Sequence, residues 1–286
     1  MQLIMKKVTI NNITLPAIGI GTWRMGDSTS QRATEIAAIQ ASIEAGAKVI
    51  DTAEMYGNGR SEQLIKQAIQ PYNRDDLYLI DKVLPTNAGK GQLESSLDQS
   101  LANVGTDYFD LYLLHWRGGI PLAETIDELE RVKQAGKIKA WGVSNFDVAD
   151  LKELWQLPNG NHCVANEDLY NLDKRGIEYD LLTLMKQHNL PLIAYSPLSQ
   201  GDTITGKLLD NPVLNQIADN HQATVEQIML AWVLRISNVL AIPQSSNPQH
   251  AKANVEAGEI ELTDKELLIL QKEFPTPTSK QALAVI

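Results

Sequence analysis

The sequence predicts a single (β/α)₈ barrel, the TIM-barrel class of α/β fold, on three observations. Strand-like apolar runs alternate with helical patterns along the chain at spacings of roughly 25–40 residues, as parallel strands with crossover helices require. Eight such units occur, which is the number that closes a barrel. The length of 286 residues and the hydrophobic fraction of 43% are enough for one large core.

Apolar runs locate the expected strands, and turn or capping residues mark their ends. The expected barrel strands are residues 17–21, 48–51, 77–82, 110–115, 140–143, 164–166, 191–195 and 239–242. The expected helices are residues 32–45, 62–70, 92–104, 123–135, 148–154, 179–188, 213–220, 225–236, 248–257 and 264–274. A hairpin with a polar turn is expected over residues 8–18, and a proline-containing tail over 275–286.

An open doubly wound sheet is the competing α/β architecture. That fold normally carries a G-x-G-x-x-G fingerprint between its first strand and helix. Here Gly-Ile-Gly21 is followed by Thr-Trp-Arg-Met-Gly26, which breaks the spacing. No linker or low-complexity segment marks a second domain, so residues 1–286 are expected to form one domain.

Composition limits the kinds of molecule that the protein is expected to bind. A net charge of −10 argues against a nucleic-acid backbone or an anionic membrane, although a local basic site could still hold a small anion. No run of about 18 apolar residues predicts a membrane span. The first seven residues lack a signal-peptide pattern, and the one cysteine, Cys163, is expected to be a buried thiol. A cytoplasmic protein is therefore expected.

Ionisable residues gather where the second, third and fourth strands end. Asp51 ends the second strand and Tyr56 lies in the loop after it, Lys82 ends the third, and His115 ends the fourth. His115 shares a strand face with Leu113 by alternation. The carboxyl ends of barrel strands are where catalytic groups usually lie. Each residue alone has an ordinary structural explanation, such as a turn aspartate or a solvated lysine, but the joint arrangement predicts an active site.

These and other motifs together resemble the aldo-keto reductase family, in its bacterial aldehyde reductase form. The matching stretches span nearly the whole chain in the family's order: Gly-Ile-Gly-Thr-Trp23, Ile-Asp-Thr-Ala-Glu-Met-Tyr-Gly57, Lys82, Asp-Leu-Tyr-Leu-Leu-His115, Gly-Val-Ser-Asn-Phe146, Tyr-Ser-Pro-Leu198 and Ile-Pro243. The resemblance implies a barrel with a hairpin across its bottom. It also implies reversible, nicotinamide-dependent reduction of a carbonyl substrate without a metal.

The four ionisable residues fit that chemistry. Hydride comes from the cofactor, so the protein must give a proton to the developing alkoxide. Tyr56 is expected to be that acid, with Lys82 lowering the pKa of its hydroxyl and Asp51 keeping Lys82 charged and oriented. His115 is expected to hydrogen-bond the substrate carbonyl.

Cofactor contacts can be carried over where the motifs match. Ser144 and Asn145 resemble the pair that binds the nicotinamide carboxamide, and Tyr195 resembles the aromatic ring that stacks on nicotinamide. Ser196, Leu198 and the loop beyond them resemble the pyrophosphate clamp, at the place where barrels usually bind phosphate. Gly21 and Thr22, at the exit of the first strand, complete this expected set.

Two departures from the family pattern concern the cofactor. Glu167 stands where the family often has glutamine, and a glutamate donates to the carboxamide carbonyl only when protonated. Gln244 and His250 stand where a lysine and an arginine usually bind the 2′-phosphate of NADP, while Ser245 and Asn254 remain as polar contacts to the adenosine end. NADP(H) is therefore expected to be favoured by a reduced margin, and NAD(H) use is possible.

Other functions remain open at this stage. The chain could be a nucleotide-binding regulatory or scaffold subunit with little turnover, although an intact set of catalytic residues argues against it. It could also be a barrel isomerase or lyase that uses Lys82 as a Schiff base, which the Tyr-Ser-Pro-Leu198 and Ser144-Asn145 stretches fit poorly. A pocket rimmed by Trp23, Met55, Trp116 and the tail favours small apolar or aromatic aldehydes, including α-dicarbonyls. A closed barrel needs no partner, so a monomer is expected.

Overall fold

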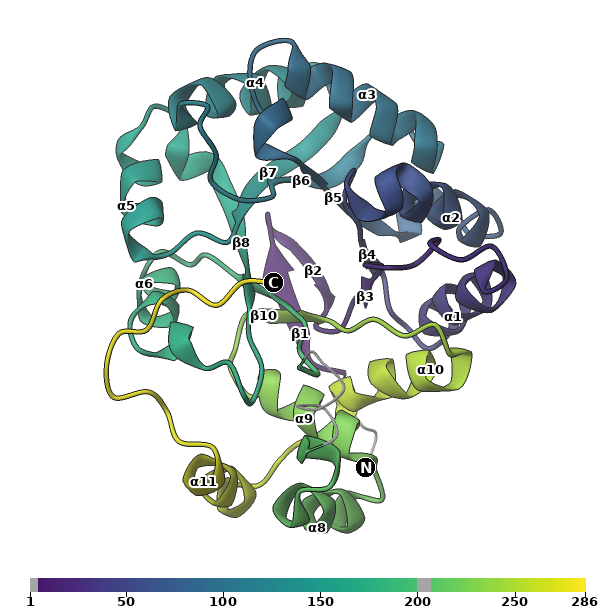
Figure 1. Cartoon of the computed structure of the whole chain (residues 1–286), viewed down its shortest axis with the longest axis vertical. Coiled ribbons are helices and arrows are strands. Elements are labelled where there is room, and N and C mark those ends of the chain that lie inside the picture. The colour runs from purple at the N-terminus through teal and green to yellow at the C-terminus, as the bar shows by residue number, and fades with distance from the viewer. Residues whose placement is uncertain (1–4, 200–206) are drawn as a thin grey trace.

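Eight parallel strands form the barrel of this protein, and helices surround it (Figure 1). The computed structural model describes residues 5–199 and 207–286. Each strand pairs with the next along the chain: β3 (Ile20–Gly21), β4 (Val49–Asp51), β5 (Tyr78–Val83), β6 (Phe109–Leu114), β7 (Ile138–Ser144), β8 (Cys163–Leu169), β9 (Leu192–Tyr195) and β10 (Val239–Ile242). The predicted (β/α)₈ barrel is confirmed.

The helices lie on the outside of the barrel, where their apolar faces cover the strands (Figure 1). They are α1 (Arg32–Glu44), α2 (Arg60–Ala68), α3 (Gln92–Val104), α4 (Leu122–Gln134), α5 (Val148–Gln156), α6 (Leu181–Gln187), α8 (Pro212–His221), α9 (Val225–Val233), α10 (Pro248–Glu256) and α11 (Asp264–Glu273). None of the helices in the described part of the chain has the length and apolar surface needed to cross a bilayer.

The barrel closes between its first and last strands. Ile18 forms a parallel bridge with Ala241, and the amide of Gly21 donates to the carbonyl of Pro243 at 3.0 Å. A Cβ atom at Gly21 would lie 2.6 Å from the carbonyl oxygen of Ile242, closer than real Cβ atoms approach. Glycine at position 21 is thus required by barrel closure, whatever else it contacts.

A hairpin covers the bottom of the barrel. Strands β1 (Lys7–Ile10) and β2 (Ile13–Pro16) flank Asn11 and Asn12, which both have positive φ angles, 48° and 64°. Positive φ at both central residues is the type I′ geometry that suits two-residue hairpins, and asparagine tolerates it. Three buried hairpin side chains pack against the inward-facing residues of the barrel, namely Val8, Ile10 and Leu15. The hairpin therefore fills the bottom of the barrel interior.

Strand alternation then divides the barrel interior into an apolar and a polar layer. The apolar layer includes Val49, Ile80, Leu113, Ala165 and Ile193. Two residues further along the same segments, on the same face, come Asp51, Lys82, His115, Glu167 and Tyr195. The polar layer lies at the carboxyl ends of the strands, above a sealed apolar base.

Several segments differ from the sequence prediction at their ends: the first barrel strand, expected over residues 17–21, forms only over Ile20–Gly21, and the helix expected over 225–236 ends at Val233. The helix expected over residues 179–188 forms only over Leu181–Gln187, because Asp180 has φ −145° and interrupts the turn that precedes it. Strand β8 extends to Leu169, three residues beyond the predicted end, because residues 167–169 pair in register with residues 193–195 of β9. Its polar side chains are buried, and the Asn166 amide donates to Asp168 at 2.6 Å inside the fold.

The C-terminal tail returns across the barrel after α11 (Figure 1). Lys280 holds it in place through Asp147 and Asp180, with Nζ–Oδ1 distances of 2.6 and 2.8 Å. This tether brings Ile286 to the open end of the barrel, where it lines the pocket.

A buried carboxyl pair lies between β5 and the outer helices. Asp81 is fully buried, accepts a hydrogen bond from the Lys82 amide at 2.8 Å, and faces Glu62 of α2. Burial, followed by repulsion from Glu62, raises the pKa of Asp81 well above its usual range. The folded state thus holds a proton that the unfolded chain releases above about pH 4.

Because the folded pKa is the higher one, this carboxyl destabilises the fold more as pH rises through that value. We expect Asp81→Asn to raise the melting temperature at pH 8 more than at pH 5, by roughly 2–4 °C for each kcal/mol relieved. Thermal unfolding followed by circular dichroism at both pH values measures this. Asp107→Asn, at an exposed position, is the control. A benefit that shrinks as pH rises would contradict this account.

Candidate active site

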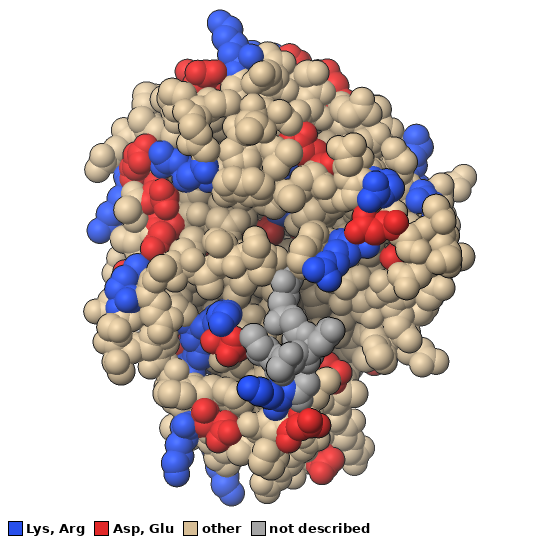
Figure 2. All heavy atoms as spheres, viewed as in Figure 1, with Lys and Arg blue, Asp and Glu red and all other residues tan. Residues whose placement is uncertain are grey.

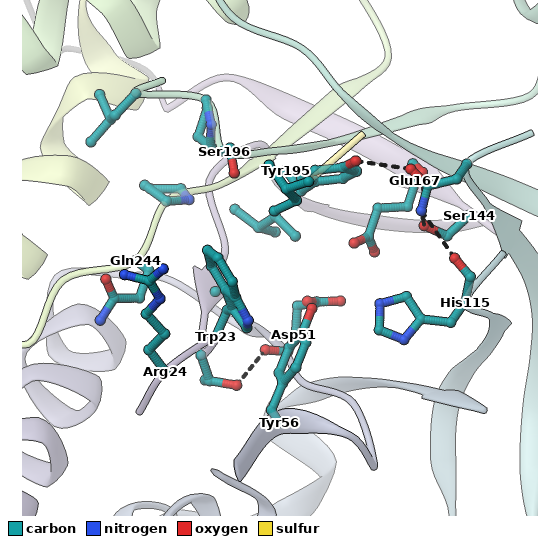
Figure 3. Close-up of a pocket in the computed structure, with 18 of the residues that line it drawn as sticks. Trp23, Arg24, Asp51, Tyr56, His115, Ser144, Glu167, Tyr195, Ser196 and Gln244 are labelled. Carbon is teal, nitrogen blue, oxygen red and sulfur yellow. Dashed lines mark hydrogen bonds between the residues drawn. The ribbon is translucent and has the colours of Figure 1, made fainter. Parts of the chain in front are cut away.

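A pocket of about 800 Å³ opens at the carboxyl ends of the strands (Figure 3). Its size lies in the range of about 300–1,000 Å³ that ligand pockets occupy. The predicted site residues that line it are Gly21, Thr22, Trp23, Asp51, Met55, Tyr56, His115, Trp116, Ser144, Asn145, Glu167, Tyr195, Ser196, Leu198 and Gln244. Lys82 lies just beneath its floor, fully buried.

Lys82 is the centre of the pocket floor. Its ammonium lies 2.5 Å from Asp51 Oδ1, 3.4 Å from Glu167 Oε1 and 3.5 Å from the hydroxyl of Tyr56, and it donates to the carbonyl of Thr52 at 3.0 Å. Asp51 ends β4, Lys82 lies in β5, and Tyr56 begins the 3₁₀ helix η1 (Tyr56–Gly59). Glu167 comes from β8, so β4, η1 and β8 all bring polar atoms to the one ammonium of β5.

The charges in this cluster depend on one another. Burial alone would lower the pKa of Lys82, but attraction to Asp51 and then Glu167 outweighs it and holds the pKa well above its usual range. Burial raises the pKa of Asp51 although Lys82 opposes the shift. The ammonium is therefore charged across the working pH range of an enzyme.

Tyr56 differs from the sequence expectation in the net direction of its pKa. The Lys82 charge does lower the pKa of this hydroxyl, as expected. Burial is the larger effect, however, and the net pKa is raised above the usual value of tyrosine. Tyr56 is thus a fully protonated donor near neutral pH, and the buried ammonium moderates the cost of forming its phenolate.

His115 faces Tyr56 across the pocket, with the two ring centroids 5.9 Å apart at 74°. Burial, helped by repulsion from Lys82, lowers the pKa of His115 to about 3. Its Nδ1 is buried without a hydrogen-bond partner in the described part of the chain. A neutral imidazole beside a protonated phenol can hold a carbonyl oxygen between two uncharged donors.

A hydrogen-bonded chain runs along the wall from His115 to Tyr195 (Figure 3). The Asn145 amide donates to the His115 carbonyl at 3.0 Å and to Ser144 Oγ at 3.1 Å, and its oxygen accepts from the Tyr195 hydroxyl at 2.8 Å. Ser144 Oγ in turn donates to the carbonyl of Glu167 at 2.9 Å. These bonds fix the orientation of the Tyr195 ring and of the amide beside it.

Thr22 connects two of the strand ends that form the site. Its hydroxyl donates to the carbonyl of Asp51 at 2.8 Å and accepts from Ser61 at the same distance. It thereby ties the exit of β3 to the exit of β4, where Asp51 begins its contact with Lys82.

Not every predicted cofactor residue borders this pocket. Gln244 lines it, and its amide donates to Ser246 at 3.1 Å. Ser245, His250 and Asn254 do not line it: Ser245 accepts from the Asn247 amide ahead of α10, His250 is exposed in the first turn of that helix, and Asn254 is buried further along. The predicted loop beyond Leu198 falls partly on residues 200–206, which lie outside the described residues.

Sequence reasoning missed Arg24, which lines the pocket on the same side as Gln244 (Figure 3). Its guanidinium lies 4.4 Å from the centroid of the Trp23 ring, and its backbone has a positive φ of 66°. Barrel closure could have revealed it, because the loop after the first strand must lie beside the loop after the eighth. Arg24 therefore supplies a positive charge at the end of the pocket near Gln244, which replaces a basic residue of the family pattern.

Charged side chains around the open end alternate in sign on the face shown in Figure 2. Salt bridges of the chain include Arg117 with Glu153 at 2.9 Å and Lys280 with Asp147 at 2.6 Å. Within the described residues, no cluster of three or more histidine, cysteine or acidic side chains could hold a metal ion.

Comparisons with known proteins identify the family of this chain. Residues 17–272 match the sequence model of the Aldo/keto reductase family. Methylglyoxal reductase YeaE of Escherichia coli is 46% identical over 275 residues, which make up 96% of this chain and 96% of that protein. Two crystal structures of aldo/keto reductases from Klebsiella pneumoniae, one with NADP and acetate and one with NADPH, each have a TM-score of 0.96 and 43% identity, covering 99% of this chain and 100% of theirs.

The chain belongs to the aldo/keto reductase family, and it is an oxidoreductase with the barrel fold of that family. The family membership that the sequence motifs indicated is confirmed. The roles of individual site residues rest on the geometry above.

The low pKa of His115 has a direct test. We expect its imidazole to stay neutral between about pH 5 and 9, because protonation would add a charge to a buried site that already holds the Lys82 ammonium. Lys82→Met should raise the pKa of His115, since it removes the second cause of the shift. Titration by NMR, with the resonance assigned from its loss in His115→Gln, measures both. Protonation of His115 near pH 6.5 in the wild-type protein would disprove this expectation.

Proposed function

We propose that this protein reduces small aldehydes, and α-dicarbonyl compounds in particular, with NADPH as hydride donor and Tyr56 as proton donor. The observation that carries the proposal is the buried Lys82 ammonium within reach of both Asp51 and the Tyr56 hydroxyl, at the floor of a pocket that also holds a neutral His115. Methylglyoxal, the substrate in the name of the Escherichia coli relative, is such a dicarbonyl.

The rim of the pocket supports a small, partly apolar substrate. Trp23, Met55, Trp116 and Ile286 line it, and Met55 and Trp116 are more than a third exposed. Trp116 also packs against the His115 ring at 4.7 Å between centroids. A small carbonyl compound could lie under this rim with its oxygen toward His115 and Tyr56.

Proton delivery is the chemical task of the chain's own residues. When bound, the reduced nicotinamide supplies a hydride to the carbonyl carbon. The Tyr56 hydroxyl gives its proton to the carbonyl oxygen as the C–H bond forms, so the alcohol product gains one hydride and one proton. Lys82 stabilises the phenolate left on Tyr56, and Asp51 holds Lys82 toward it. His115 positions the carbonyl oxygen through a neutral N–H bond.

The chain also offers a suitable set of groups for the nicotinamide end. The ring of Tyr195 borders the pocket, as do the polar groups of Ser144, Asn145 and Glu167, and this supports the proposed nicotinamide contacts. Glu167 Oε2 is buried without a hydrogen-bond partner in the described part of the chain, as a group awaiting a ligand donor or acceptor would be. Ser196 and Leu198, also on the pocket wall, are proposed for the pyrophosphate.

At the other end, Arg24 is proposed to compensate for the missing lysine. A phosphate prefers an arginine in charge-assisted hydrogen bonds, and Arg24 is the exposed cation beside Gln244 on this side of the pocket. His250, Ser245 and Asn254 are proposed to contact the adenosine end. NADP(H) is therefore favoured, with NAD(H) as the weaker cofactor.

The alternative functions have weaker support. A Schiff-base lysine must lose its proton easily, whereas Asp51, with Glu167 beside it, holds the pKa of Lys82 well above its usual range. A regulatory or scaffold subunit would not need the contacts among Asp51, Tyr56 and Lys82. Because the sheet closes on itself, we also propose that the protein works as a monomer, which its mass in solution would test. The cytoplasmic location stays a prediction from the sequence.

The proton donor is tested by Tyr56→Phe. We expect kcat for methylglyoxal reduction with NADPH to fall by on the order of 10² or more, while the Kd for NADPH stays within a small factor, because only the donated proton is lost. Steady-state kinetics and fluorescence titration measure the two quantities. A wild-type protein without turnover on any aldehyde would favour the scaffold alternative, and near wild-type turnover in the variant would remove Tyr56 from the mechanism.

Substitutions at Arg24 and Gln244 test the cofactor preference. A charged contact to the 2′-phosphate is worth about 1.5–3 kcal/mol, or roughly 10–150-fold in affinity. We expect Arg24→Gln to weaken NADPH more than NADH, and Gln244→Lys to strengthen NADPH with little effect on NADH. Kd values of both cofactors for the wild-type protein and the two variants measure these effects. A large NADPH preference that neither variant alters would show that the phosphate is held elsewhere.

A further inference from the structure

The Lys82 ammonium is shared by two carboxyl groups rather than one. Asp51 lies 2.5 Å and Glu167 3.4 Å from Nζ, and the three side chains are 0–3% exposed. Asp51 makes the shorter contact, so its carboxylate is the main counterion. Glu167 is a second acid in the position where the family often has a neutral glutamine.

Among residues 5–199 and 207–286, the other groups around Glu167 offer it no further positive charge. The titratable side chains that face this cluster from the surrounding segments are Tyr56 of η1, His115 after β6 and Tyr195 of β9. Asp168 lies next in β8 on the opposite face, where the Asn166 amide donates to it. The phenols and the imidazole are uncharged near neutral pH, so the cluster holds one cation for two acids.

An uncompensated buried carboxylate is costly, and buried acids commonly keep a proton instead. Burial, then repulsion from Asp51, raises the pKa of Glu167 well above its usual range, although Lys82 opposes the shift. A protonated glutamic acid also presents one donor and one acceptor, as a glutamine amide does. Glu167 can thus take the place of glutamine while carrying a removable proton.

We propose that Glu167 is protonated in the cofactor-free enzyme and releases this proton to solvent when the oxidised, but not the reduced, nicotinamide cofactor binds. The inference rests on the proposed NADP(H) function. The oxidised nicotinamide ring carries a positive charge and the reduced ring is neutral. A positive ring held between Tyr195 and the polar wall would be a second cation for the second carboxylate. Glu167 is thereby a positioning residue whose charge follows the oxidation state of the cofactor.

Calorimetry with the full-length protein tests the proton release. NADP⁺ and NADPH are each titrated into the protein at pH 7 in two buffers of different ionisation enthalpy. The difference in heat between the buffers gives the number of protons released when each cofactor binds. Protons exchanged by the 2′-phosphate are common to both ligands and cancel in the difference. We expect NADP⁺ to release up to about one proton more than NADPH, and the ratio of Kd for NADP⁺ to Kd for NADPH to fall by up to about tenfold per pH unit as pH rises. Equal proton numbers for the two ligands would overturn the proposal.

Variants assign the proton to its side chain. In Glu167→Gln, which keeps the shape and the hydrogen-bonding pattern, the difference between the two ligands should vanish. Asp168→Asn is the matched control, because Asp168 is also buried and burial raises its pKa, yet it lies outside the pocket. This variant should keep the difference. A difference that persists in Glu167→Gln would contradict the assignment.

Infrared spectroscopy of the cofactor-free protein separates this proposal from the proposed function. The wild-type spectrum minus that of Glu167→Gln should contain the C=O band of a protonated carboxylic acid at pH 7. Absence of that band would overturn the proposal even if both cofactors bind. Failure of both cofactors to bind would reject the NADP(H) function and, with it, the release step, whereas the band itself would still report the proton on Glu167.

Discussion

The burial of one ammonium group is the constraint on which the site depends. Lys82 has no solvent contact, and a charge in such a place is tolerated only when it is paired and hydrogen-bonded. Asp51, Glu167 and the Thr52 carbonyl meet this need, and Tyr56 lies at the remaining open side. The groups that stabilise the lysine are thus the same groups that bring it to the phenol.

The barrel makes this arrangement possible by separating its interior into two layers. The hairpin and the apolar residues of the lower layer exclude water from below, so the polar layer above them has only one exposed side. In such surroundings, interactions between charges are stronger than in water, and removing a charged group from water is also more costly. That balance explains why Lys82 stays charged while His115 beside it stays neutral.

The sequence was sufficient to predict the barrel and to bring together Asp51, Tyr56, Lys82 and His115, because strand alternation and parallel order place strand ends at one edge. It was not sufficient where tertiary packing decides. The length of β8 was underestimated because the buried acidic residues Glu167 and Asp168 look like loop residues in a hydrophobicity pattern. Arg24 was missed because only barrel closure places the loop after β3 beside Gln244. The net pKa direction of Tyr56 depends on burial, which residue spacing does not report.

The glutamate at position 167 shows how a small chemical change can alter the charge of a whole site. Glutamine and protonated glutamic acid have nearly the same shape and hydrogen-bonding pattern, so the exchange leaves packing intact. The acid nevertheless adds a titratable group beside Asp51 and Lys82, so the cluster can occur in more than one protonation state. Since Tyr56 contacts the same ammonium, any change in the Glu167 charge also changes the field at the proposed proton donor. In this chain the charge of Glu167, a proposed cofactor contact, is therefore coupled to Tyr56, the proposed proton donor.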